Sequence, residues 1–276
     1  MPIVTASLYG GLGNQLFQIA ATIAYSFKHG LNYQFKHSTN LGKRPTYWSN
    51  FLHKMSKNLT EDLDTSGFIT INEASYVFST VVSSVVLDDY FQSPQFFNDY
   101  REQILDIFDI ESHRRTVQQK YNIIESSISI HFRRGDYKQL PDCHPILPDD
   151  YYAESIHYIL TQDSSVTHIY YYCEDEDAAD IERVIAEFKT LFEGLSWSRM
   201  KADADWEEMV CMSCSRHHVI ANSSFSWWGA YLRTDSIVEK NIVEKNIVCY
   251  PALWFGPLIA KDVSTMFPPE WIKIWI

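Results

Sequence analysis

The chain has 276 residues, a length that suits one large domain or two of medium size, and 46% of its residues are hydrophobic. Its formal charge of −12 argues against non-specific binding to nucleic acids or anionic membranes, so any anion site must be a local basic pocket. No stretch reaches the roughly 18 consecutive apolar residues of a membrane span, and five scattered cysteines suit a reducing compartment, so we expect a cytoplasmic protein.

The chain begins with a predicted strand, a glycine-rich turn and a helix. Residues 3–9 are typical of a buried strand, and no basic segment of the kind that opens a signal peptide precedes them. The turn GGLGN, residues 10–14, follows, and from Leu16 onward apolar residues recur at helical spacing until Gly30 ends the helix. Such a turn leaves backbone N–H groups at a helix N-terminus, where an anion or a sugar hydroxyl can bind. A tight strand-to-helix turn without any ligand explains the same residues.

Beyond this unit the chain continues to alternate between strands and helices. Residues 36–66 indicate loops and short elements, and residues 111–120 form a charged segment that we interpret as the connection between domains 1–120 and 121–276. The predicted strands are residues 81–87, 123–132, 167–173, 219–221 and 247–250. The predicted helices are residues 95–110, 149–160, 178–192, 206–215 and 225–232. The second half therefore alternates as a Rossmann-like α/β domain does, and we interpret the tandem pentapeptide in residues 237–246 as a local duplication.

The stretch HFRRGDY, residues 131–137, places two adjacent arginines at the end of a predicted buried strand. An arginine is always charged and can grip phosphate oxygens with a two-pronged fork. Side chains alternate across a strand, so His131 and Arg133 share one side while Arg134 faces the other. One arginine can then enter a cleft while the other is held by Asp136. An ordinary Arg–Asp ion pair at the surface is the alternative.

A second polar segment, residues 222–232, follows a short predicted strand and opens a helix. Its Asn and Ser side chains could serve only as helix caps. They could equally hold a phosphate, together with backbone amides and the helix dipole. We expect Trp227 and Trp228 to lie in the core or to form the wall of a cleft.

Three patterns raise the question of a metal ion. The acidic run 174–177 and the D-x-D pattern of Asp203 and Asp205 could ligate a divalent cation, but acids are favoured before a helix in any case. Cys211 and Cys214 match C-x-x-C but lack the second pair of ligands that a structural zinc site needs. Their helical surroundings favour two buried small residues instead. We therefore expect no metal site.

Four segments, taken in order, resemble the signature blocks of the family 11 glycosyltransferases, the α-1,2-fucosyltransferases. They are residues 10–18 (GGLGNQLFQ), 90–93 (YFQS), 131–137 (HFRRGDY) and 221–232 (ANSSFSWWGAYL). Each block is weak alone, whereas their order over nearly the whole chain is specific. The resemblance implies a GT-B-like architecture, α/β with two Rossmann-like domains facing a central cleft. It also implies an inverting, metal-independent and cofactor-free transfer of L-fucose from GDP-β-L-fucose to a glycan, at the 2-hydroxyl of galactose.

The resemblance further assigns roles to individual residues. Arg133 would bind the donor diphosphate, and the polar segment 222–232, called the serine block below, would hold the same group. The glycine-rich turn would approach from the other domain. Glu208 matches the acid that takes guanine N1–H and N2–H in related families. The implied donor-binding residues are Gly11, Gly13, Asn14, Arg133, Glu208, Asn222, Ser223, Ser224 and Phe225. The candidate catalytic residues are Arg133 and, as bases for the acceptor hydroxyl, His131 and Asp136.

Two departures from the family pattern accompany the resemblance. Glu207-Glu208 stands where the family commonly has Glu-Asp, and Cys173-Glu174-Asp175 stands where it has Ser-Asp-Asp, so no role is carried to that second position. Three alternatives follow: a transferase that uses another GDP-deoxysugar such as GDP-rhamnose, a non-catalytic glycan- or nucleotide-binding relative, and a metal-dependent enzyme that uses the D-x-D acids.

Overall fold

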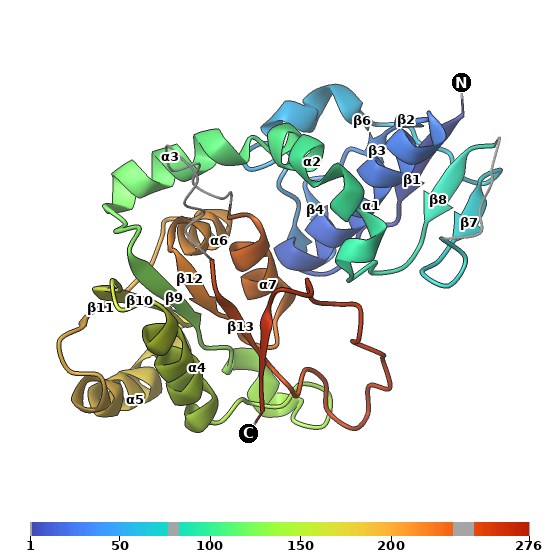
Figure 1. Ribbon diagram of the computed structural model, residues 1–276. Helices are drawn as coiled ribbons and strands as arrows, with labels where there is room; N and C mark the ends of the chain where they lie inside the picture. Colours follow the sequence, from blue (N-terminus) through green and yellow to red (C-terminus); the bar gives the residue numbers. More distant parts are fainter. Residues whose placement is uncertain (1, 77–82, 234–245, 276) are drawn as a thin grey trace. The chain divides into compact units, whose positions relative to one another are not determined.

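The computed structural model describes residues 2–76, 83–233 and 246–275 (Figure 1). It divides into two compact units, one of Met1–Ser112 with Ser264–Pro268 and one of His113–Val263 with Pro269–Ile276. The division falls inside helix α3 (Ile110–Tyr121), and a short segment near the end of the chain belongs to the N-terminal unit. Among the described residues, no helix combines the length and the apolar character that crossing a membrane requires.

The N-terminal unit is built on a four-stranded parallel sheet in the order β2-β1-β8-β7. Its strands are β1 (Ile3–Ala6), β2 (Asn32–Tyr33), β7 (Ile69–Ile71) and β8 (Val85–Leu87). Two further pairs join β3 (Phe35–Lys36) to β6 (Leu59–Thr60) and β4 (Asn40–Leu41) to β5 (Arg44–Pro45). Helix α1 (Leu12–His29) follows β1 and ends at Gly30, whose φ of +63° lies in the left-handed region that favours glycine. Residues 81 and 82 of the predicted strand 81–87 lie outside the described residues.

The helix that the sequence predicts after this sheet is interrupted. The chain forms the 3-10 turns η3 (Pro94–Phe96) and η4 (Asn98–Tyr100) and then α2 (Arg101–Ile107). Phe97 breaks the first part with φ −149° and ψ −6°, and Asp109 separates α2 from α3 with φ 55°. The charged segment 111–120, which we interpreted as a connection, is helical within α3. Its first turn carries Glu111 and its last turn Lys120, charges that suit the helix dipole.

The C-terminal unit is built on a six-stranded sheet in the order β11-β10-β9-β12-β13-β14, and every neighbouring pair is parallel (Figure 1). The strands are β9 (Ser127–His131), β10 (His168–Tyr172), β11 (Ser196–Arg199), β12 (His217–Val219), β13 (Val248–Pro251) and β14 (Ile272–Ile274). Numbered along the chain, the order is 3-2-1-4-5-6, that of dinucleotide-binding Rossmann folds. The order reverses between β9 and β12, and in open α/β sheets ligands bind beyond the carboxyl ends of the strands at such a point.

Helices cover both faces of this sheet, as a parallel sheet requires. They are α4 (Asp149–Gln162), α5 (Ala178–Leu191), α6 (Asp205–Cys214) and α7 (Ser224–Tyr231). Ile128 and Ile130 of β9 form one core cluster with side chains of α4 and α5. On the other face of β9, Ser129 hydrogen bonds to His218 Nδ1 at 2.8 Å. All five residues of β9 are buried, so the strand that precedes the arginines is rigidly packed.

Every strand and helix that the sequence predicts for this half is present, and two further strands were missed. β11 and β14 lie at the two edges of the sheet and are partly exposed, so they carry no continuous apolar run that a pattern could detect. Residues 237–245 of the tandem pentapeptide lie outside the described residues.

Tyr151 of α4 ties two central strands together, and its removal tests this arrangement. Its buried hydroxyl lies 2.6 Å from the Ile220 carbonyl oxygen and 3.1 Å from that of Cys249, and it can donate to either. We expect Tyr151→Phe to lower the free energy of unfolding by about 1–3 kcal/mol, because the Ile220 carbonyl oxygen loses this donor, whereas that of Cys249 still accepts from the Ile220 N–H. Urea titration followed by tryptophan fluorescence measures the change. Tyr158→Phe, at a half-buried position of the same helix, is the control, and equal stability of the two variants would contradict the assigned role.

Candidate functional site

The two polar motifs of the C-terminal unit meet at the point where the strand order reverses. One follows β9 and the other follows β12, and these strands are neighbours. The Tyr137 hydroxyl donates to the Asn222 backbone oxygen at 2.9 Å, and the rings of His131 and Phe225 lie 5.7 Å apart. Parallel strands bring their carboxyl ends to one edge of the sheet, so segments separated by about 85 residues form one site.

Arg133 is the central cation of this site. Its Nη1 donates to the Glu174 carboxylate, and its Nη2 donates to Asp136 Oδ1 at 2.7 Å. Its guanidinium lies over the Tyr137 ring, 5.3 Å from the ring centre. The side chain is 21% exposed, so the guanidinium is held by these neighbours yet can still be reached by a ligand.

The predicted pairing of Arg134 with Asp136 is wrong. Arg134 Nη2 donates instead to Asp149 Oδ1, at 2.7 Å, at the start of α4. Asp136 belongs to the 3-10 helix η5 (Gly135–Gln139), which turns its carboxylate back toward Arg133 three residues earlier. The two arginines do have separate partners: Glu174 and Asp136 hold Arg133, whereas Asp149 holds Arg134.

His131 is a poor candidate for the general base. It is buried at the end of β9, and its Nδ1 has no hydrogen-bond partner among the described residues. Burial, with a smaller effect of the Arg133 charge, lowers the pKa of His131 to about 3. The imidazole is therefore neutral at physiological pH but accepts a proton only weakly.

The serine block includes the start of helix α7, where one side chain caps the helix and another joins two loops. The Ser223 Oγ accepts from the Phe225 N–H at 3.3 Å, which is an N-cap. Asn222 is buried, and its Nδ2 donates to the carbonyl oxygens of Pro145 at 3.0 Å and Trp254 at 3.1 Å. The Nδ2 group of Asn222 thus holds two loops together, while its buried Oδ1 has no hydrogen-bond partner among the described residues. Ser224 and Phe225 are half-buried, so they are the members of the block that a ligand can reach.

The two tryptophans of the block belong to the core. Trp227 and Trp228 are fully buried, and their rings contact each other with centres 5.3 Å apart. Their burial anchors α7 in the core, while the first turn of the helix forms part of the site.

The adjacent acids Glu207 and Glu208 of α6 have different environments. Glu207 is buried and accepts from Lys120 Nζ at 2.9 and 3.0 Å and from the Tyr121 hydroxyl at 2.6 Å. Glu208 accepts only a long bond among those described, from the Ala202 N–H at 3.3 Å, and burial raises the pKa of its carboxyl above the ordinary value. Glu207 is committed to the fold, whereas Glu208 retains acceptor capacity.

Several acids of the two acidic patterns are engaged by other groups of the protein. Asp203 pairs with Lys120 at 2.7 Å, and Asp205 accepts from the Trp206 N–H at the start of α6. In the run 174–177, Glu174, Glu176 and Asp177 bring ligand atoms within 4.8 Å of one another. However, Asp177 is buried against the Gly135 N–H, at 2.7 Å, and the ammonium group of Lys138. Asp177 is therefore engaged by the protein itself.

Cys211 and Cys214 are buried free thiols on α6. Burial raises the pKa of both thiols, which disfavours the thiolate that metal binding and redox chemistry need. The cysteines are structural, as their helical spacing indicates.

In the N-terminal unit, the glycine-rich turn and the block YFQS also meet. Helix α1 begins at Leu12, so Gly13 and Asn14 belong to its first turn. Asn14 Oδ1 accepts from Gln92 Nε2 at 2.9 Å. A Cβ at Gly10, where φ is +85°, would collide with the Asn14 side chain, so glycine permits this close approach. The first turn carries no acid and no side-chain cap, which leaves its N–H groups to an anion.

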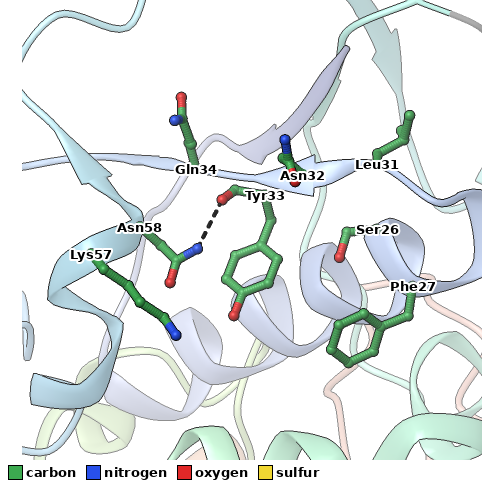
Figure 2. A pocket seen from close by; sticks show the side chains of 8 residues that line it. All are labelled: Ser26, Phe27, Leu31, Asn32, Tyr33, Gln34, Lys57 and Asn58. Carbon is green, nitrogen blue, oxygen red and sulfur yellow. Dashed lines mark hydrogen bonds between the residues drawn. The ribbon is translucent and has the colours of Figure 1, made fainter. Parts of the chain in front are cut away.

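A cavity of about 270 Å³ lies elsewhere in the N-terminal unit, at the end of α1 opposite to the glycine-rich turn (Figure 2). It is lined by Ser26 and Phe27 of α1, by residues 31–34 and by Lys57 and Asn58. Asn58 Nδ2 donates to the Tyr33 carbonyl oxygen at 3.2 Å. None of the predicted site residues lines it, so this cavity is separate from the candidate site.

Four residues that hold the site together were not predicted in these roles. The sequence offered Glu174 and Asp177 only as possible metal ligands of the acidic run, and Lys138 and Asp149 lie outside the four signature blocks. The position of Glu174 directly after a predicted strand was a signal that could have identified it, but only the sheet shows that this strand is next to β9.

Comparison with known proteins places the chain in a family. The family described as Glycosyl transferase family 11 matches residues 4–273. The α-1,2-colitosyltransferase of Escherichia coli is 24% identical over 304 residues, which cover 99% of each chain. The O-antigen biosynthesis glycosyltransferase WbnK of Escherichia coli is 28% identical over 204 residues, 70% of this chain and 62% of the relative.

Solved structures of glycosyltransferases have the same fold. Escherichia coli ADP-heptose lipopolysaccharide heptosyltransferase II aligns with a TM-score of 0.51 at 9% identity, over 99% of this chain and 90% of that one. The NodZ α-1,6-fucosyltransferase crystallised with GDP aligns with a TM-score of 0.50 at 12% identity, over 83% and 91%. The predicted GT-B architecture is confirmed, and the chain belongs to glycosyl transferase family 11.

Proposed function

We propose that this glycosyltransferase moves L-fucose from GDP-β-L-fucose to the 2-hydroxyl of a galactose residue on an acceptor glycan, with inversion to an α-1,2 linkage. The observation that carries the proposal is the meeting, at the reversal point of the sheet, of the segment that bears Arg133 with the segment that opens α7. A guanidinium beside a helix N-terminus is suited to a diphosphate, because both present positive charge and N–H donors.

The main chemical requirement on the site is to stabilise the leaving group. As the acceptor oxygen bonds to C1 of the sugar, the bond from C1 to the diphosphate oxygen breaks and GDP gains negative charge. Arg133 would grip the diphosphate with its fork, while the Ser224 hydroxyl and the first-turn N–H groups of α7 would donate to the same oxygens. These fixed donors would take the place of a metal ion, so we propose a reaction without metal or cofactor.

Glu208 would select the base of the donor. A carboxylate can accept guanine N1–H and N2–H together, whereas adenine offers no such pair of donors. The acceptor capacity that Glu208 retains supports this role, and the partners of Glu207 argue against it for the neighbouring acid. The contribution of Gly11, Gly13 and Asn14 to donor binding stays a prediction.

The acceptor side needs little help from a base under this proposal. His131 is a weak base, and Asp136 is engaged by Arg133, so we assign Asp136 to the orientation of the guanidinium. In a transition state with much oxocarbenium character the hydroxyl loses its proton late, to water or to an oxygen of the leaving diphosphate, which reduces the need for a strong base.

A second donor is favoured by one of the relatives. The relative that covers 99% of the chain is named an α-1,2-colitosyltransferase, and colitose differs from fucose only in lacking the 3-hydroxyl. A donor pocket that makes no hydrogen bond to this hydroxyl would accept GDP-colitose as well as GDP-fucose.

A panel of donors tests the proposed reaction. GDP-fucose, GDP-colitose, GDP-rhamnose and ADP-heptose are each offered with lactose, and product is measured by mass spectrometry with and without EDTA. We expect transfer from GDP-fucose or GDP-colitose, unchanged by EDTA, and an α-1,2 linkage by NMR. Transfer from ADP-heptose alone, or loss of activity in EDTA, would contradict the proposal.

Substitution of Arg133 tests the diphosphate assignment. We expect Arg133→Ala to lower kcat/KM by about a hundredfold or more, because the charge on the leaving group loses its main counter-charge. Arg133→Lys should remain strongly impaired, since a point charge cannot replace the fork. Arg134→Lys, at the arginine that holds α4, is the matched control. Steady-state kinetics with circular dichroism separates catalysis from folding, and near wild-type turnover in a folded Arg133→Ala protein would refute the assignment.

Substitutions of the adjacent residues Glu207 and Glu208 test which acid selects the guanine base of the donor. We expect Glu208→Gln to reduce the preference for GDP over ADP by about tenfold, because an amide presents only one acceptor oxygen. Glu207→Gln should lower the thermal stability and leave the preference unchanged. Calorimetric titration with both nucleotides gives the ratio. A loss of preference in the Glu207 variant and not in the Glu208 variant would reverse the assignment.

A further inference from the structure

Glu174 occupies one of the terminal N–H groups of Arg133. It is the second residue after β10, as Arg133 is the second after β9, and these strands are neighbours in the sheet. Its carboxylate accepts from Arg133 Nη1. It also lies against Gly135, and a Cβ at that position would overlap the carboxylate oxygen. The absence of a side chain at Gly135 is thus what lets Glu174 reach the guanidinium.

The two carboxylates on Arg133 differ in how easily they can leave. Asp136 is three residues away on the 3-10 helix η5, so local backbone geometry keeps it beside the guanidinium. Glu174 reaches across from the segment that follows β10 on a longer side chain, and no local backbone geometry holds it there. Both carboxylates are partly exposed, 38% for Glu174 and 50% for Asp136, so neither ion pair is strong and the difference between them lies in this tethering. An anion with more charge can therefore replace Glu174 more readily than Asp136.

We propose that Glu174 is an internal counter-anion, which occupies Arg133 in the free enzyme and is displaced by the donor diphosphate. Glu174 would then act as a positioning residue. It keeps the guanidinium aimed at the site while no donor is bound, and it lowers donor affinity by competing for the same N–H groups. The inference rests on the proposed role of Arg133 in diphosphate binding.

Two variants remove the competition by different means. Glu174→Gln removes the charge and leaves the shape. Gly135→Ala keeps the charge and pushes the carboxylate away from Arg133, and the backbone permits it because Gly135 is not among the positive-φ residues. Glu176→Gln removes a neighbouring negative charge that does not contact Arg133, and it serves as the control for a general field effect.

Calorimetric titration with GDP and with inorganic pyrophosphate measures the effect. We expect both Glu174→Gln and Gly135→Ala to bind each probe about two- to fivefold more tightly than wild type, the range expected for loss of an exposed competing pair. In steady-state kinetics the change should lie in the donor KM more than in kcat. Unchanged or weaker binding in both variants, or equal tightening in Glu176→Gln, would overturn the proposal.

The pH dependence gives an independent readout. The charged groups that act on Glu174 are Arg133 and Asp136 of the η5 side and Glu176 and Asp177 of its own segment, and burial raises the pKa of its carboxyl. As the pH falls through this raised pKa, Glu174 gains a proton and stops competing. The ratio of wild-type to Glu174→Gln affinity should therefore approach one at acidic pH, while protonation of the probe affects both proteins alike. A ratio that stays constant would count against the proposal.

The outcomes also separate this inference from the proposed donor. Pyrophosphate reports on Arg133 without any base, so tighter binding in both variants supports the role of Glu174 even where ADP and GDP bind equally well. If the enzyme prefers GDP to ADP but Glu174→Gln and Gly135→Ala bind the probes as wild type does, the result supports the proposed donor and rejects the proposed role of Glu174.

Discussion

The reversal of strand order between β9 and β12 is the constraint on which the candidate site depends. The connections from these neighbouring strands lead in opposite directions, so their carboxyl ends are left to polar segments instead of a crossover helix. The Tyr137 hydroxyl and the Asn222 carbonyl join these segments, and the Asn222 amide ties in the loops of Pro145 and Trp254. A rigid, fully buried strand thereby carries Arg133 to a defined position at the edge of the sheet.

The environment of Arg133 explains how an acidic protein can keep a cationic site. With a formal charge of −12, the chain repels anions at long range, and only a local arrangement of donors can bind one. Two carboxylates and an aromatic ring hold the guanidinium while it stays partly accessible. Local partners also distinguish the two neighbouring acids of α6. Lys120 and Tyr121 donate hydrogen bonds to Glu207, whereas Glu208 keeps acceptor capacity for a ligand.

The fold of the C-terminal unit was largely predictable, because buried parallel strands and amphipathic helices leave strong periodic patterns. The edge strands β11 and β14 escaped detection, since partial exposure removes the continuous apolar run. In the N-terminal half the prediction was poorer. Phe97 and Asp109 adopt backbone conformations that interrupt a region of helical composition, and the helical spacing of apolar residues does not report such breaks.

Sequence by itself determined the family, the positions of the motifs at strand ends and the separation of Arg133 from Arg134, because these follow from residue identity and strand periodicity. Only the tertiary structure decided the partners. Asp149 holds Arg134, where the sequence suggested Asp136, and Glu174 shares Arg133 with Asp136. The Nδ2 group of Asn222 joins two loops, a contact that the sequence did not predict. Partners of this kind come from different strands and loops, and their contacts depend on which strands become neighbours in the sheet. Which strands become neighbours is determined by the packing of the whole domain and not by the local sequence pattern.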